Sequence, residues 1–263
     1  MRIALGLEYD GTTFDGWQSQ PNGNTVQDKL QSALSQIAQQ PTQVIAAGRT
    51  DAGVHAVAQV VHFDTEVQRP LTAWERGVNV ILPPSIAVQW AVPVTEDFHA
   101  RYSASSRRYH YVLYNHATRP ALLNGKTGWF HLPLNLTSMQ EATKHLIGEH
   151  DFSAFRSSEC QAKTPIKTLH SVEVVQQERF FIFKFWANAF LHHMVRNIVG
   201  CLVYIGKGKY PAEWIKTVLK SKDRTLAAPT FSPNGLYLSA ITYDPKWQIP
   251  SSRRMISPLF VDG

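Results

Sequence analysis

Residues 25–38 read TVQDKLQSALSQIA, and this stretch decides how the first half of the chain folds. Thr25, followed three positions later by Asp28, resembles a capping box, the arrangement that opens an α-helix. The apolar residues recur at helical spacing, and they are Val26, Leu30, Ala33, Leu34 and Ile37. The sequence therefore predicts an amphipathic helix that begins at residue 26 and ends at residue 38.

Strand patterns lie on both sides of this helix. Alternating residues predict a strand at 3–9 before it, and two β segments follow at 44–47 and 57–63. A second helix begins at residue 72, and a strand over 86–94 closes the series. The order βαββαβ is that of a ferredoxin-like unit.

The second half repeats this order with insertions. The expected elements are a strand at 108–114, a helix at 138–147, a hairpin at 169–175 and 180–187, helices at 191–205 and 211–219, and a strand at 236–242. Residues 115–135 lack periodicity and are expected to form a long loop. We therefore expect an α+β protein of two ferredoxin-like (RRM-like) halves with mainly antiparallel sheets, 1–103 and 104–245, followed by a tail, 246–263. A cleft between two such halves is the expected place for a ligand.

Composition narrows the class of protein. The chain has 263 residues, of which 44% are hydrophobic and 17% charged, and this balance is typical of globular proteins. No apolar run is long enough to cross a bilayer and no signal peptide is recognisable, so a cytoplasmic protein is expected. Cys160 and Cys201 lack metal-ligand spacing. A net charge of +6 and a pI near 9.3 permit a polyanionic partner.

The loop between the expected strands at 44–47 and 57–63 contains a lone carboxylate. Residues 46–56 read AAGRTDAGVHA, with Asp51 flanked by small residues. An aspartate between glycines is often a turn residue, because its side chain bonds the loop itself. The alternative is that Gly48, Ala52 and Gly53 let a bulky ligand approach the backbone beside the carboxylate. The residues alone leave both interpretations open.

The helix in ANAFLHHMVRNIVGCLVYIG, residues 187–206, carries an unusual arginine. Arg196 has Val199, Gly200 and Val203 as its neighbours along the helix surface, so a substantially buried guanidinium is expected. A buried cation needs a carboxylate partner, and Asp51 is a good candidate. The alternative is an arginine that extends to solvent.

Residues 98–115, FHARYSASSRRYHYVLYN, interleave arginines with tyrosines. Arginine binds phosphate and tyrosine stacks on bases, a combination expected of a protein that binds single-stranded or flipped-out nucleotides. Tyr109, Tyr111 and Leu113 fall on one face of the expected strand. An edge strand with core tyrosines and solvated arginines explains the pattern equally well.

Taken together, these blocks resemble the tRNA pseudouridine synthase A family. The matching stretches are YDGTTFDGWQSQPNGNTVQDKL, AAGRTDAGVHAVAQVVHF, FHARYSASSRRYHY, LIGEHDFSAFR, ANAFLHHMVRNIVG, NGLYL and a C-terminal PLF. They cover nearly the whole chain, and GRTDAGVHA is highly specific. The chain departs at Lys163 and Lys167, where arginines are expected, and at Ala58, where glycine is common; lysine keeps the charge but loses the forked donor geometry.

The resemblance implies a role for five residues. Asp51 would be the catalytic aspartate, and Arg49 would contact RNA phosphate and help hold the target nucleotide out of its stack. Tyr109 would stack on the uracil, Leu236 would pack against it from the other side, and Arg196 would pair with Asp51.

The resemblance also implies an activity and a substrate. The protein would have the pseudouridine synthase fold and would isomerise uridines 38, 39 and 40 in the anticodon stem-loop of tRNA. It would act as a homodimer without metal or organic cofactor. Asp51 would act by attacking C1′, by adding to the uracil ring or by removing a sugar proton. Two other classes fit the residues less completely: an RNA-binding module without catalysis, and a nucleoside hydrolase, which would need a second carboxylate with a raised pKa.

Overall fold

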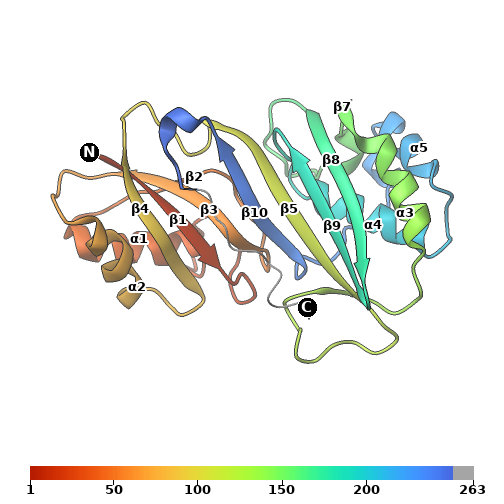
Figure 1. Ribbon diagram of the computed structural model, residues 1–263, viewed down its shortest axis with the longest axis horizontal. Helices are drawn as coiled ribbons and strands as arrows, with labels where there is room; N and C mark the ends of the chain where they lie inside the picture. The colour runs from red at the N-terminus through yellow and green to blue at the C-terminus, as the bar shows by residue number, and fades with distance from the viewer. Residues whose placement is uncertain (251–263) are drawn as a thin grey trace. The chain divides into compact units, whose positions relative to one another are not determined.

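The computed structural model describes residues 1–250, and these form two compact parts (Figure 1). The first part comprises Met1–Ser105 and the described chain from Tyr237 onward, and the second is Ser106–Leu236. Each part combines helices with a mostly antiparallel sheet, which confirms the predicted α+β class. Within residues 1–250, no helix is long and apolar enough to cross a membrane.

The first part has the predicted βαββαβ order. Its elements are β1 (Arg2–Tyr9), α1 (Val26–Ala38), β2 (Ile45–Ala46), β3 (His55–Asp64), a π-helical turn (Ala73–Gly77) continuing into α2 (Val78–Ile81), and β4 (Ile86–Val94). The strands lie in the order β4-β1-β3, antiparallel throughout, with β2 also paired to β3. The Thr25 side chain accepts a hydrogen bond from the Asp28 amide, so Thr25 is the N-cap, and both predicted bounds of α1 are confirmed.

The last strand, β10 (Leu236–Tyr243), belongs mainly to the first part, whereas the sequence placed residues up to 245 in the second half. Tyr237 and Leu238 pair in parallel with His55 and Ala56 of β3. The Tyr243 hydroxyl donates to the Ala100 carbonyl at 2.7 Å. These bonds join the strand to the N-terminal sheet. Of the expected tail 246–263, residues 251–263 and the PLF stretch lie outside the described residues.

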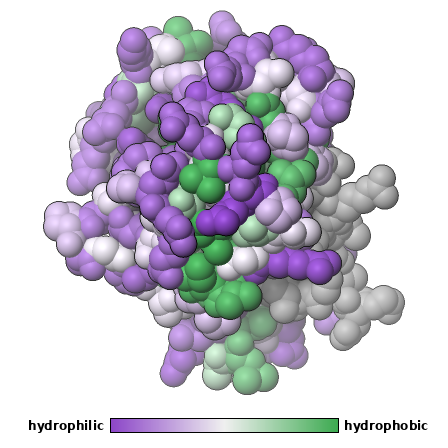
Figure 2. Space-filling view, turned by 90° about the vertical axis from the view of Figure 1, so that its left-hand side faces the viewer, coloured by the Kyte–Doolittle hydropathy of each residue, from purple (hydrophilic) through white to green (hydrophobic). Residues whose placement is uncertain are grey.

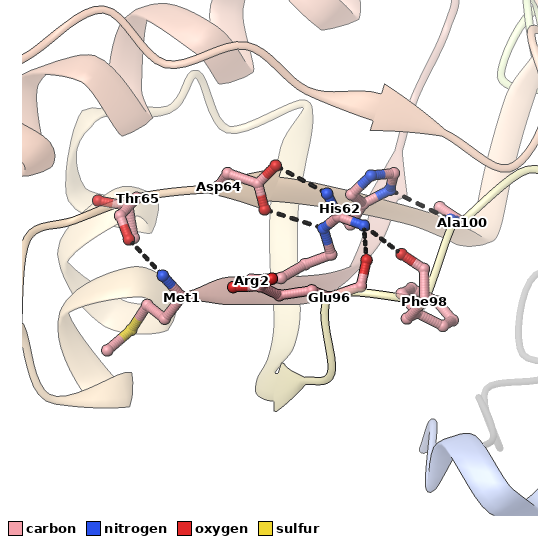
Figure 3. Close-up of polar contacts among 8 residues, drawn as sticks. All are labelled: Met1, Arg2, His62, Asp64, Thr65, Glu96, Phe98 and Ala100. Carbon is pink, nitrogen blue, oxygen red and sulfur yellow. Dashed lines mark hydrogen bonds and ion pairs between the residues drawn. The ribbon is translucent and has the colours of Figure 1, made fainter.

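One arginine ties three segments of the first part together (Figure 3). The Arg2 guanidinium binds both carboxylate oxygens of Asp64 at 2.8 Å and donates to the carbonyls of Glu96 and Phe98. Beside it, the Nδ1 atom of His62 accepts a hydrogen bond from the Ala100 amide at 3.1 Å. The start of β1, the end of β3 and the segment after β4 are therefore held at one point.

The interior of the first part is apolar and its outer surface is mixed. Around Phe98, a cluster of Ala4, Ala47, Val60 and Ala100 is buried and covered by partly buried aromatic and aliphatic side chains. Figure 2 shows one face of the molecule, where hydrophilic residues predominate around a band of hydrophobic ones. The first part thus provides a rigid sheet on which a loop can be positioned.

The second part is built on a separate set of strands. Its elements are β5 (Ala104–Asn115), β6 (Gly128–Phe130), α3 (Leu136–Thr143), β7 (Gly148–Asp151), β8 (Ile166–Gln177), β9 (Phe180–Ala187), α4 (Met194–Gly206) and α5 (Trp214–Ser221). The strand order is β5-β9-β8-β7, antiparallel between neighbours in the pairs β5–β9, β9–β8 and β8–β7. The expected hairpin and helices are present, but residues 115–135 also contain β6, which pairs in parallel with β5.

Candidate active site

The loop that carries Asp51 connects two strands that are bonded to each other. Ile45 and Ala46 of β2 pair with His62 and Val61 of β3, so the chain leaves and re-enters the same sheet around residues 47–54. Asp51 itself is half-buried. A short loop between paired strands has little conformational freedom, and a rigid sheet can therefore aim its side chains.

Buried polar contacts fix the residues on the N-terminal side of Asp51. Thr50 is buried, its hydroxyl lies 2.8 Å from the Tyr9 hydroxyl, and its carbonyl accepts from the Trp17 amide at 2.9 Å. Gln59 donates to the Gly48 carbonyl at 2.7 Å. Burial raises the pKa of Tyr9 to about 12, so this phenol keeps its proton near neutral pH. These bonds hold the backbone, and with it the position of Asp51.

A second loop, residues 10–17, closes against the Asp51 loop at van der Waals distance. A Cβ added to Gly11 would lie 2.0 Å from the Val54 carbonyl oxygen, and one on Gly16 would lie 2.7 Å from the Thr50 carbonyl oxygen. Gly16 also has a φ of 90°, a conformation that favours glycine. The Phe14 carbonyl accepts from the Gly53 amide at 3.3 Å. Only glycines allow the two backbones to pack this closely.

His55, at the start of β3, supports the same contact. Its Nδ1 atom accepts a hydrogen bond from the Gly11 amide at 3.0 Å, and its ring stacks on Tyr237 with 4.6 Å between centroids. The same nitrogen lies 3.2 Å from an Asp10 carboxylate oxygen. His55 therefore holds residues 10 and 11 in place.

Arg49 and Ala52 are exposed on either side of this fixed backbone. An exposed guanidinium two residues before the carboxylate is of the type that binds phosphate and carboxylate groups. The loop therefore combines a fixed carboxylate, a small neighbour and an accessible cation.

The second part contains the other three expected site residues. Tyr109 lies on β5 opposite Phe185 of β9, is 9% exposed, and packs edge-on against Phe190 with ring centroids 5.0 Å apart. Tyr111 and Leu113 are fully buried on the same strand. The predicted face of Tyr109, Tyr111 and Leu113 is therefore confirmed as the inner face of β5.

Arg196 lies in the first turn of α4 and is half-buried. Its Nε atom donates to the Phe231 carbonyl at 2.9 Å, and its own carbonyl accepts from the Phe231 amide at 3.2 Å. The next residue, Asn197, is fully buried and bonds Phe155, Arg224 and Thr230. Sequence reasoning missed the Phe231 contact, because a main-chain carbonyl leaves no signal in residue type.

Leu236, the first residue of β10, is buried at 6% exposure, and its amide donates to the Pro233 carbonyl at 2.9 Å. Lys167, noted as a departure from the expected arginine, is also buried, and its amine donates to the carbonyls of Thr164 and Ile166 at 2.7 and 2.8 Å. Asp51 and Arg49 thus lie in the first part, and Tyr109, Arg196 and Leu236 in the second. The expected pairing of Asp51 with Arg196 stays a prediction.

Comparison with known proteins identifies the class. A family model described as tRNA pseudouridine synthase matches residues 7–103 and 142–244. This covers well over half of the chain, so the protein belongs to the tRNA pseudouridine synthase family. It is an enzyme that isomerises uridine to pseudouridine in tRNA, and its fold is that of the pseudouridine synthases.

Full-length relatives give the more particular similarity. A protein of Nitrosomonas eutropha named tRNA pseudouridine synthase A is 60% identical over 251 residues, 95% of this chain and 91% of the relative. One of Dechloromonas aromatica with the same name is 60% identical over 250 residues, 95% of both chains. Among solved structures, a chain of "Crystal Structure of a Cbf5-Nop10-Gar1 Complex" aligns with a TM-score of 0.35 at 12% identity, over 88% of this chain and 47% of that one.

Proposed function

We propose that Asp51 carries the isomerisation and that the uridines are those at positions 38, 39 and 40 of the tRNA anticodon stem-loop. The observation that carries the assignment is the loop around residues 47–54, where hydrogen bonds to Thr50 and the close approach of Gly11 fix the backbone beside the carboxylate. A group that acts on a reacting atom must be held within a fraction of an ångström. A simple turn aspartate needs no such support.

The reaction itself places demands on the site. The N1–C1′ bond breaks, the uracil turns, a C5–C1′ bond forms, and the C5 hydrogen leaves as a proton while N1 gains one. A stacked base conceals these atoms, so the nucleotide is first flipped out at a cost of a few kcal/mol. We assign Tyr109 to stacking on the flipped uracil, Leu236 to the opposite wall and Arg49 to the phosphate beside it. These contacts offset the flipping cost.

Arg196 is assigned to pairing with Asp51. A guanidinium beside the carboxylate favours its ionised form in a partly dry site, which suits a nucleophile or a base. The Phe231 carbonyl supports this role because it fixes the Nε end of the guanidinium and thereby orients the side chain. Water must be excluded, since hydrolysis of the detached intermediate would leave an abasic site. We further propose that the protein acts in the cytoplasm as a homodimer and without metal or organic cofactor.

Tritium release from tRNA labelled at C5 of uridine tests this proposal. We expect Asp51→Asn to abolish release while tRNA binding is retained, because the substitution removes the charge and keeps the shape. Asp64→Asn, a carboxylate change in the same sheet, serves as the matched control and should leave release intact. Mass-spectrometric mapping of the product then locates the modified uridines. Release by Asp51→Asn at the wild-type rate, or pseudouridine only outside positions 38–40, would contradict the respective assignment.

A further inference from the structure

The chain segment from α4 to the turn after α5 holds most of the net charge of the protein. Residues 194–226 contain seven lysines and arginines and two acidic residues, a net charge of +5 out of +6 for the whole chain. Three of these cations have internal partners: Arg196 bonds Phe231, Lys222 lies 3.3 Å from Asp151, and Arg224 bonds Asn197 and Thr230. The remaining lysines are 207, 209, 216 and 220.

The end of α4 brings two of these lysines over one ring. The Gly208 amide donates to the Ile205 carbonyl at 2.8 Å and the Lys209 amide to the Tyr204 carbonyl at 3.0 Å, the two bonds of a Schellman motif. Gly208 has a φ of 77°, as this motif requires at that position. The chain therefore turns back on the helix, and Lys209 returns to the same side as Lys207.

Both ammonium groups lie against aromatic faces. The Nζ atom of Lys207 is 4.0 Å from the centroid of the Tyr204 ring, and that of Lys209 is 4.8 Å from the same centroid and 5.2 Å from that of Tyr210. Tyr210 in turn stacks on Trp214 at 4.0 Å and 17°. Cation–π contacts of this kind fix a lysine head without neutralising it. Within residues 1–250, neither amine is within ion-pair distance of a carboxylate.

Two converging cations without a carboxylate are suited to a polyanion. The negative end of the α4 dipole offsets part of their mutual repulsion, but it supplies no charge outside the protein. The two nitrogen atoms are separated by no more than about 8.8 Å, the sum of their distances to the shared ring centre. Phosphates along one nucleic-acid strand bind lysines as point charges and release counterions when they do so.

The position of this cluster on α4 relates it to the proposed uridine site. Arg196 and Tyr204 are the two residues of α4 that are not buried, and Lys207 follows the last turn. Lys207 is eleven positions after Arg196, which is about three turns and about 16 Å along the axis. The two residues therefore lie on the same side of the helix within about 20°. A tRNA that reaches the Arg196 end of this helix can extend along it to the Lys207 end.

We infer that Lys207 and Lys209, held by Tyr204 and Tyr210, form a second contact for the phosphate backbone of the tRNA substrate, separate from the residues that hold the uridine. The lysines supply the positive charge, and the tyrosine rings hold the lysine side chains in place. The inference rests on tRNA being the substrate and is independent of the role given to Asp51.

Binding of unmodified tRNA to the full-length protein, measured over a series of salt concentrations, tests this inference. We expect the double variant Lys207→Gln and Lys209→Gln to bind roughly tenfold more weakly at low salt, with the slope of log K against log salt reduced by about 1 to 2. The matched control is Lys216→Gln with Lys220→Gln, which removes the same charge from exposed positions of α5. A second variant, Tyr204→Leu with Tyr210→Leu, should weaken binding while the slope is unchanged, because the charges remain.

The outcomes separate the alternatives. Wild-type affinity and slope in the Lys207 and Lys209 variant would overturn the inference, and so would an equal loss in the α5 control, which would indicate a diffuse field. A changed oligomeric state with unchanged tRNA binding would assign the surface to a second copy of the chain and also overturn it. Tritium release at saturating tRNA should match wild type, so failure here is distinguishable from failure of the Asp51 assignment.

Discussion

The two parts of the molecule hold their candidate site residues in different ways. In the first part, Asp51 lies on a loop whose position depends on main-chain hydrogen bonds and on backbone contact with Gly11. In the second part, Tyr109 lies on a regular strand and packs against Phe190, and Arg196 lies in a regular helix and its side chain donates a hydrogen bond to the Phe231 carbonyl. Both arrangements give rigidity, but they respond differently to substitution.

The difference teaches where each part is vulnerable. A loop positioned by backbone contact tolerates no added atom at that contact. The carbonyls of Thr50 and Val54, which face the glycines, cannot move unless the neighbouring backbone moves too. A side chain on a strand or helix can be replaced by one of similar shape with limited loss. We therefore expect the first part to control the rate through loop geometry, and the second to control how well the uridine is held.

Gly11→Ala should give the largest effect in this comparison. The new Cβ would lie 2.0 Å from the Val54 carbonyl oxygen, so the loop after Asp51 must shift. A displacement near 1 Å lowers the rate of tritium release about 100-fold. Gly23→Ala is the control, since its Cβ has no atom within 4 Å, although its positive φ carries a small stability cost. Equal activity of the two variants would show that the contact between Gly11 and the Val54 carbonyl does not position Asp51.

Substitutions of Tyr109, in the second part, should have an intermediate effect on tritium release. Tyr109→Phe keeps the ring and its edge-on contact with Phe190, and should retain most of the activity. Tyr109→Ala loses base stacking worth about 1–3 kcal/mol, which corresponds to a fall in single-turnover tritium release of roughly 5- to 150-fold. Thermal unfolding of both variants separates this loss from lost packing. Equal turnover in the two variants would exclude a stacking role.

The smallest effect concerns stability against pH. Burial, and then the nearby Arg2, lowers the pKa of His62 to about 4, while an unfolded histidine titrates near 6.5. The unfolded chain therefore binds a proton first as pH falls, and the contribution of neutral His62 is full above pH 6.5 and lost as pH approaches 4.

Urea unfolding at pH 7 and pH 4.5 measures this contribution. His62→Gln, which can still accept from the Ala100 amide, should show about 1–2 kcal/mol less difference between the two pH values than wild type. His110→Gln offers the counterpart in the second part, because burial also lowers the pKa of His110 to about 4. If His62→Gln had the same pH dependence as wild type, the pKa of His62 would be the same in the folded and the unfolded chain, and this prediction would be wrong.

Regular elements of the fold were predictable and contact-dependent features were not. Periodicity and the Thr25 cap predicted α1 with both bounds, and alternation predicted β4 and β9, because these patterns arise from residues close in the chain. The short strand β6 and the main-chain partner of Arg196 depend on residues distant in sequence. Likewise, only the structure reveals the Val54 carbonyl that Gly11 faces.

The same difference holds for the candidate site. Asp51 and Arg49 were found through the small residues around them and the family resemblance. The support from the Tyr9 hydroxyl, the Trp17 amide and the His55 ring was not. Hydroxyl and imidazole groups have many other uses in a core, and a main-chain amide leaves no signal in residue type. The sequence thus indicates candidate reacting groups, whereas the groups that hold their backbone are revealed by the structure.

The most direct test of the account is single-turnover tritium release by Asp51→Asn with enzyme in excess over labelled tRNA, measured together with the Kd for tRNA. We predict a rate at least about 1,000-fold below wild type and a Kd within a few-fold of it, because the proposal assigns the carboxylate to the reacting atoms and RNA binding to other residues. A wild-type rate from this variant would contradict the account.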